Sequence, residues 1–247
     1  AAEDALQRAG AASPSERAAL LGIAGTYRYE LGEERAALPH LQAYVGLRPD
    51  DATAWFRLGA CLLRVAEVPQ GIPPASLVSA QRQAEGAARA FARCFELAPG
   101  DEDAALAVVA ALLRAAELAE ERGDDAARDE QRSAAAERLG RLAELFPGSA
   151  EVRFRVGVVA ALTARPEAAR AAYLAALERD PEHAGALLNL ASLLVESGDV
   201  AGARALLERL MAADARSRQL SRDERRRVER WLAEPADGGR GQMPRML

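Results

Sequence analysis

The residues that could carry chemistry are few, because the chain of 247 residues contains two histidines and two cysteines. Neither His40 nor His183 has a cysteine, serine or acidic residue at the spacing of a catalytic motif. Lysine is absent from the sequence, which excludes lysine nucleophiles and Schiff bases. A glycine-rich phosphate loop, a metal-ligand pair and a nucleophile elbow are also absent. The sequence therefore predicts a protein that is not an enzyme, with no catalytic residue, no metal and no cofactor.

Two other groups of residues raise metal and disulfide chemistry as alternatives. Acidic residues cluster between Asp124 and Glu130. Acids in the first turn of a helix are stabilised by its dipole, and we favour that explanation over a metal site. Cys61 and Cys94 fall on two helices of one predicted repeat. We expect two buried thiols that pack as small apolar groups. The alternative, a disulfide, needs an oxidising compartment.

The C-terminal segment is rich in arginine, with seven arginines within residues 216–233. Acidic residues are interleaved with them, and Val228, Trp231 and Leu232 form an apolar stripe at i, i+3 and i+4. The formal net charge of −5 argues against a general polyanion binder. We therefore expect this segment to form a capping helix rather than a nucleic-acid site, and residues 234–247 to form a flexible tail.

The elements that must position these residues follow from a repeated pattern that ends in proline. Each copy has an alanine, a large apolar residue four positions later, another apolar residue three later and a proline five later. Such self-similarity marks a solenoid, in which each unit buries its apolar face by stacking on the next. The copies are Ala37/Leu41/Tyr44/Pro49, Ala87/Phe91/Cys94/Pro99, Ala135/Leu139/Leu142/Pro147, Ala169/Tyr173/Ala176/Pro181 and, without its proline, Ala203/Leu207/Leu210.

An amphipathic segment precedes each copy of the pattern. Its apolar residues recur at helical spacing, as at Trp55, Leu58 and Gly59. Glycine in mid-stripe costs about 1 kcal/mol of helix propensity. We expect Gly25, Gly59 and Gly157 to let a partner helix approach closely. Abundant alanine and leucine with few β-branched residues predict an all-α protein.

These residues carry a resemblance to a known family. The order Trp55, Leu58, Gly59, Leu62, Ala87, Phe91 and Pro99 is similar to the signature of the tetratricopeptide repeat (TPR) superfamily, whose units are helix–turn–helix pairs of 34 residues. The resemblance implies a right-handed α-solenoid of antiparallel helix pairs. It covers five units and what flanks them: lead-in residues 1–17, where Ala2, Leu6 and Ala9 hint at a further half-repeat; units 18–51, 52–101, 102–149, 150–183 and 184–215; the capping helix 216–233; and the tail.

Units two and three are longer than the family repeat. Pro49 to Pro99 spans 50 residues and Pro99 to Pro147 spans 48, against 34 for Pro147 to Pro181. The surplus of the third unit predicts about two extra turns on each of its helices. The surplus of the second predicts a loop around Pro69, followed by a long helix. We expect these lengthened helices to stand together as a fin, a second docking surface or a simple embellishment.

The resemblance implies that the first helix of each unit lines a concave groove that binds a peptide. Large apolar residues recur at one place in four successive units, and we expect this row to be exposed and to need a partner that covers it. The implied partner-binding residues are Tyr29, Phe56, Arg57, Leu63, Arg64, Leu106, Leu113, Arg114, Phe154, Arg155, Val158, Leu188, Asn189 and Ser192.

The same residues indicate the kind of partner. The best-known TPR variant grips a terminal carboxylate with Lys, Asn and Arg, and the matching places of the first three units do not hold that clamp. The polar anchors in the groove are Arg57, Arg155 and Asn189. We therefore expect an adaptor or scaffold for a protein partner whose segment is apolar or an amphipathic helix, with acids that meet the arginines.

Two alternatives stay open on function. The first is a client-binding chaperone or assembly factor, for instance for an envelope complex, and the second is self-association through the groove. The sequence predicts no membrane span, because it has no apolar run of sufficient length. The use of arginine in place of lysine is typical of a GC-rich genome and favours a bacterial origin. Cytoplasm and periplasm both remain open.

Overall fold

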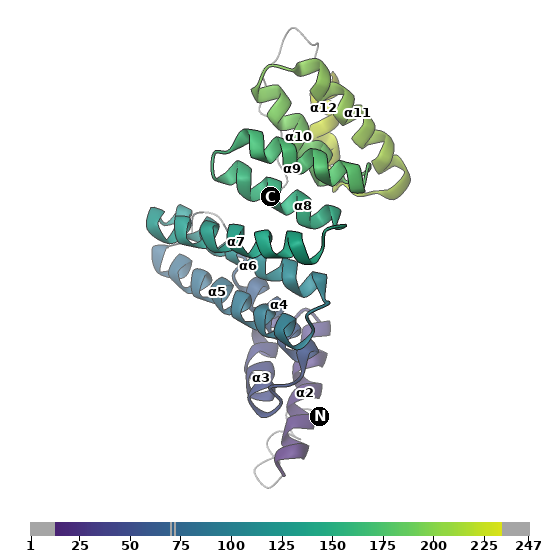
Figure 1. The fold of residues 1–247 in the computed structure, drawn as a ribbon. Helices are drawn as coiled ribbons and strands as arrows, with labels where there is room; N and C mark the ends of the chain where they lie inside the picture. The colour runs from purple at the N-terminus through teal and green to yellow at the C-terminus, as the bar shows by residue number, and fades with distance from the viewer. Residues whose placement is uncertain (1–12, 70, 72, 234–247) are drawn as a thin grey trace. The chain divides into compact units, whose positions relative to one another are not determined.

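The structure is a computed structural model that describes residues 13–69, 71 and 73–233. The described residues form eleven helices and no strand, and consecutive helices pack in pairs (Figure 1). Turns of three residues, at 31–33, 122–124, 163–165 and 197–199, make four of these pairs antiparallel. The all-α solenoid class is confirmed. The helices are α2 (Pro14–Glu30), α3 (Glu34–Leu47), α4 (Ala52–Val65), α5 (Pro74–Leu97), α6 (Glu102–Glu121), α7 (Asp125–Leu145), α8 (Ala150–Leu162), α9 (Pro166–Arg179), α10 (Ala184–Glu196), α11 (Val200–Ser217) and α12 (Arg222–Ala233).

The chain divides into two compact units at residues 135 and 136, within α7. The N-terminal unit contains α2 to α6 and the C-terminal unit contains α8 to α12. Each unit has buried apolar residues of its own. The predicted tail and the part of the lead-in with Ala2, Leu6 and Ala9 lie outside the described residues.

The repeated prolines have a structural consequence that the sequence analysis did not anticipate. The residue two positions after each proline is the N-cap of the next helix, and its side chain accepts a hydrogen bond from a backbone N–H. Such caps satisfy one of the free N–H groups in the first turn and contribute about 1 kcal/mol each. The repeat therefore encodes the start of its next helix. The caps are Asp51, Asp101, Ser149 and His183.

The lengthened helices occur where the sequence predicts them. α6 and α7 have 20 and 21 residues and α5 has 24, against 13 or 14 in α3, α4, α8, α9 and α10. The added length of α5 and α6 buries a second apolar cluster that includes Leu77, Ala84 and Leu118. Arg132 of α7 donates to Glu120 of α6 at 2.8 Å. The extra turns thus carry packing of their own.

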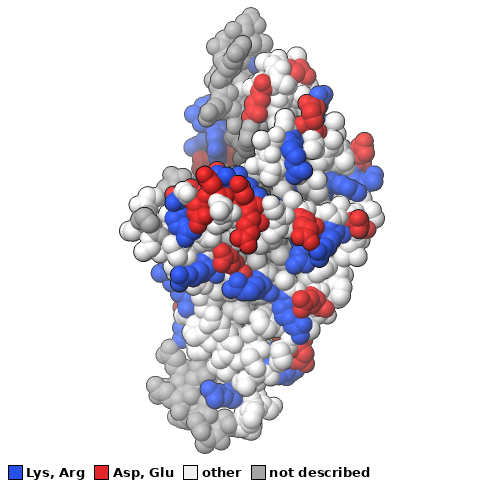
Figure 2. Space-filling model, turned by 60° about the vertical axis from the view of Figure 1, so that its left-hand side comes forward, with Lys and Arg blue, Asp and Glu red and all other residues white. Residues whose placement is uncertain are grey.

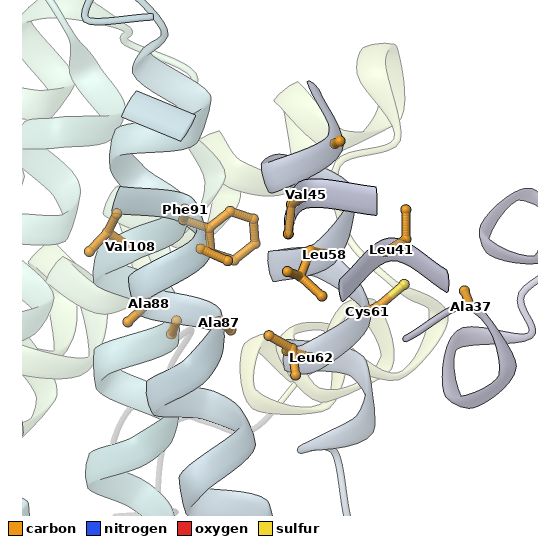
Figure 3. Packing of buried hydrophobic residues seen from close by; sticks show 13 residues of the cluster. Ala37, Leu41, Val45, Leu58, Cys61, Leu62, Ala87, Ala88, Phe91 and Val108 are labelled. Atoms are coloured by element: carbon orange, nitrogen blue, oxygen red, sulfur yellow. The ribbon is translucent and has the colours of Figure 1, made fainter. Parts of the chain in front are cut away.

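The main core of the N-terminal unit lies between α3, α4, α5 and α6. Figure 3 shows the Phe91 ring of α5 between Val108 of α6 and the residues Val45 and Leu58. Gly59 permits this packing, because a Cβ at that position would lie 2.8 Å from the Phe91 ring. The close approach expected at Gly59 is confirmed. With a larger residue in place of Gly59, α4 and α5 would have to move apart.

The C-terminal unit follows the same logic with different residues. A Cβ at Gly157 of α8 would lie 2.4 Å from the Tyr173 ring of α9, so this glycine also permits close packing. Val228 and Trp231 of α12 are buried, as expected for a helix that covers the end of the repeats. Asp214 of α11 accepts hydrogen bonds from the backbone N–H of Leu220 and from Arg225, which ties α12 to α11.

The remaining chemical candidates have structural partners. Cys61 and Cys94 are free and buried, and burial, with a smaller effect of Glu34, raises the pKa of the Cys61 thiol to about 11. Asp124 caps α7 by accepting from the N–H of Ala127 at 3.0 Å. Neighbouring acids of the same turn pair with Arg128. No helix in the described part of the chain is both long and apolar enough to cross a bilayer.

Candidate partner-binding surface

In the N-terminal unit, the predicted apolar residues lie on the first helices α2, α4 and α6, and all of them except Leu113 are half-buried. Tyr29, Phe56 and Leu63 all pack against the main core of this unit. The Phe56 ring meets the Phe91 ring edge to face, with centroids 5.2 Å apart. Leu106 of α6 is half-buried as well. Tyr29, Phe56 and Leu63 are therefore packed on the core on one side, and part of their surface remains open to solvent.

The arginines of this unit differ in their partners. Arg64 forms an ion pair with Glu34 at 3.5 Å. Arg114 forms an ion pair with Glu117 at 2.9 Å and donates to the backbone oxygen of Ala66 at 3.2 Å. Arg57 is half-buried and has no ion pair or hydrogen bond within the described ranges. Arg57 is thus the cation of this predicted set that remains available to a partner.

Leu113, the last predicted apolar residue of this unit, is buried with 7% of its surface exposed. It lies on α6 among buried alanines on either side. Its contribution is to the core of the N-terminal unit rather than to an open surface.

In the C-terminal unit, the expectation of an exposed apolar row is wrong. Phe154 is 4% exposed and Leu188 is fully buried. The cause is Gly185, at which a Cβ would lie 2.7 Å from the Phe154 ring. Because this glycine has no side chain, the ring packs directly on the start of α10. The His183 ring covers Phe154 further, with centroids 4.8 Å apart.

The polar candidates of the C-terminal unit are also inside it. Val158, Asn189 and Ser192 are buried. Asn189 donates from its Nδ2 to the Tyr173 hydroxyl at 3.3 Å, so its amide is used within the core. A buried polar side chain that is hydrogen-bonded specifies packing and offers little to a partner outside. The role of Asn189 as a polar anchor, and of Val158 and Ser192 as partner-binding residues, remains a prediction that this burial weakens.

Arg155 is partly exposed, but its charge is balanced where it lies. Its Nε donates to Glu151 at 2.6 Å, and the guanidinium stands 5.3 Å from the centroid of the Phe154 ring. Glu151 also meets Nε2 of His183 at 3.0 Å. Burial raises the pKa of Glu151, but the bonds from His183 and Arg155 outweigh burial and hold it below its ordinary value. The carboxylate therefore stays charged and compensates Arg155.

These positions concentrate the candidate surface on the N-terminal unit. Phe56, Ala60 and Leu63 form one stripe along α4. Arg57 and Arg64 lie beside this stripe, two helical turns apart. Tyr29 packs against the same core. The surface combines half-buried apolar groups with a guanidinium that has no ion pair or hydrogen bond within the described ranges.

The architecture first defines the class of protein. Helix pairs that follow one another, with a proline and an N-cap residue repeated between them, are those of an α-helical repeat protein. Residues 23–65 and residues 162–222 match the tetratricopeptide repeat family. These two stretches, one in each compact unit, identify tetratricopeptide repeats in this chain.

Solved structures of TPR proteins share the fold. TTC0263, a thermophilic TPR protein of Thermus thermophilus, is 19% identical with a TM-score of 0.59, over 89% of this chain and 99% of that chain. MamA of Desulfovibrio magneticus RS-1, from residue 41 to its end, is 19% identical with a TM-score of 0.58, over 83% and 98%. YrrB, a TPR protein with an unusual peptide-binding site, is 17% identical with a TM-score of 0.50, over 87% and 95%. At these identities the likeness concerns the fold alone.

One curated relative matches a shorter stretch. The chain is 39% identical over 72 residues to the probable biofilm formation methyltransferase WspC of Pseudomonas putida strain KT2440. The match spans 29% of this chain and 17% of the length of that protein. The family matches identify the repeats of this chain, and the solved structures share its fold.

Proposed function

We propose that the chain is a non-catalytic adaptor that binds an amphipathic helix of a protein partner on the inner face of its N-terminal unit. The observation that carries this proposal is Arg57, a half-buried cation with no partner among the residues that the structure describes, beside the half-buried apolar stripe of Phe56 and Leu63. A half-buried guanidinium gains most from a carboxylate that arrives with an apolar surface and excludes water.

The apolar residues set the form of the partner. Phe56, Ala60 and Leu63 recur at i, i+4 and i+7, so they present a stripe that complements the i, i+3, i+4, i+7 anchors of an amphipathic helix. An acid at the edge of that helix would face Arg57. The long-lived complex of an adaptor and the rapid exchange of a chaperone differ in the dissociation rate of this segment.

The test isolates Arg57 because Phe56 contributes to the core and its replacement would disturb folding. A partner recovered with the chain from lysate of its source organism is mapped to its binding peptide, and the dissociation constant is measured by calorimetry. Arg57→Glu should weaken binding by about tenfold or more, which corresponds to about 1.4 kcal/mol.

The matched control is Arg35→Glu, which makes the same charge change on α3 at an exposed arginine. This variant should bind as the wild type does. Equal binding by Arg57→Glu and wild type would place the partner elsewhere on the chain and overturn the proposal. The dissociation rate of the mapped peptide then separates an adaptor from a chaperone.

A further inference from the structure

A second surface of the N-terminal unit is a groove of about 640 Å³ between α3, α4 and α5. Its apolar lining comes from Trp55, Leu58 and Leu62 of α4, while Arg82, Arg89 and Arg93 of α5 supply its charge. The α4 residues of this groove form a stripe that lies roughly 130° around the helix from the Phe56 stripe, at 100° per residue. The groove is therefore separate from the surface assigned above.

The three arginines share one face of α5, since they are spaced by seven and four residues. Arg93 forms an ion pair with Glu96 at 2.9 Å. Arg82 and Arg89 are exposed and have no ion pair or hydrogen bond among the residues described. On the face drawn in Figure 2, many arginines and acids lie next to one another, as the blue and red side chains show.

Two of the three arginines of the groove, Arg82 and Arg89, therefore carry a charge that no acid balances in the described part of the chain. The residues that line it include no aspartate or glutamate, although the whole chain has a formal net charge of −5. A local cationic groove on an acidic protein attracts an anionic group selectively. Arginine binds carboxylates well, because its planar fork can donate two parallel hydrogen bonds to their two oxygens.

The arginines require an acidic ligand, and the floor of the groove requires that this ligand also carry an apolar group. Leu58 and Leu62 are buried beneath it, and Trp55 is half-buried. The indole N–H of Trp55 donates to the backbone oxygen of Pro49 at 3.1 Å, so the ring offers apolar surface to the groove rather than a donor. A ligand that fits both features carries an apolar side chain between two acids.

We propose that this groove binds an extended acidic peptide of the form acid–x–apolar–x–acid. In an extended chain these three side chains point to one side, and the two acids stand about 13 Å apart. Along α5, the rise from Arg82 to Arg89 is about 10 Å and from Arg82 to Arg93 about 16 Å. The acids can therefore reach arginines at both ends while the apolar side chain rests on Trp55 and Leu58.

The probe is a fluorescein-labelled peptide with the core Asp-Ala-Leu-Ala-Asp and neutral flanks, and its anisotropy is followed with the full chain. Binding should saturate for the wild type and weaken at least tenfold in the Arg82→Ala/Arg89→Ala variant. A peptide with the core Asn-Ala-Leu-Ala-Asn should not bind. These arginines are exposed, so the variant should retain the helical circular dichroism of the wild type.

The matched control is Arg170→Ala/Arg179→Ala, which removes the same charge from exposed arginines of α9 that also have no partner in the described ranges. It should bind the acidic peptide as the wild type does. An equal loss in both double variants would reveal a mere effect of net charge and overturn the proposal. The same conclusion follows if the wild type does not bind the peptide, or if a single-stranded oligonucleotide binds the groove more tightly.

Discussion

His183 differs from the other N-cap residues of this protein because it also contacts a second helix. Its Nδ1 accepts the N–H of Ala186 at 3.2 Å, in the position that Asp51, Asp101 and Ser149 occupy in the other repeats. An Nδ1 that accepts must be unprotonated, so the neutral ring carries its proton on Nε2 and donates it to Glu151. One side chain thus caps α10 and connects it to α8.

Replacement of His183 should separate these two contributions. His183→Ala removes the cap and leaves the half-buried Glu151 with one donor fewer, which we expect to lower the free energy of unfolding by about 1–3 kcal/mol. His183→Asn retains a capping side chain and should lose about half as much. Urea denaturation followed by circular dichroism measures both variants. If Ala and Asn were equally destabilising, the cap would contribute nothing.

At the scale of elements, the fit of α8 on α9 depends on Gly157. We expect Gly157→Ala to destabilise the protein by about 1–3 kcal/mol, because the new methyl group would overlap the Tyr173 ring. Gly140→Ala is the matched control, since Gly140 lies within α7 with no atom within 4 Å of an added Cβ. That control should stabilise by about 0.5–1 kcal/mol through helix propensity. Thermal unfolding of the two variants should therefore shift in opposite directions.

The attachment of α12 to α11 should depend on pH through Asp214. Burial raises the pKa of Asp214, but the hydrogen bonds from Leu220 and Arg225 outweigh burial and hold it below its ordinary value. The unfolded chain then binds this proton at a higher pH than the folded chain does. The stabilisation is complete well above the unfolded pKa of about 3.9 and is lost as the pH falls through the folded pKa.

The measurement compares the wild type with Asp214→Asn by urea denaturation at pH 7, 5, 4 and 3. The wild type should exceed the variant in free energy of unfolding at pH 7, by about 1–3 kcal/mol. The difference should shrink toward pH 3. Because the comparison is between two chains, the titration of Glu151 cancels. A difference that is independent of pH would contradict the assigned charge of Asp214.

The helices could be predicted from local sequence, whereas the burial of individual side chains depends on contacts with other helices. The helices and their lengths follow from periodicity and from the spacing of prolines, which are local properties of the sequence. The burial of Phe154 depends on what covers it, namely Gly185 at the start of the next helix and the cap residue His183. A glycine two residues after a cap was the available signal. Periodicity alone does not tell a groove residue from a core residue.

At the scale of the whole molecule, the same limit applied to the charges. The sequence shows 32 basic residues and 37 acidic ones, but not which of them pair. Arg57 and Arg155 look equivalent in the repeat, yet Arg155 is bound to Glu151 and Arg57 has no partner in the described part of the chain. The spacing of Arg82, Arg89 and Arg93 on one helix face was visible, and its meaning depended on the groove beside it.

Packing between sequence neighbours has a consequence for the kinetics of folding. Within each unit the helices pair mainly with the helix before or after them, as α4 does with α5 and α8 does with α9. Such a topology has low contact order, so little chain entropy is lost before contacts form. Nucleation can start at any helix pair and spread to its neighbours. Each unit should accordingly refold within microseconds to milliseconds. We expect no slow phase that comes from the formation of long-range contacts.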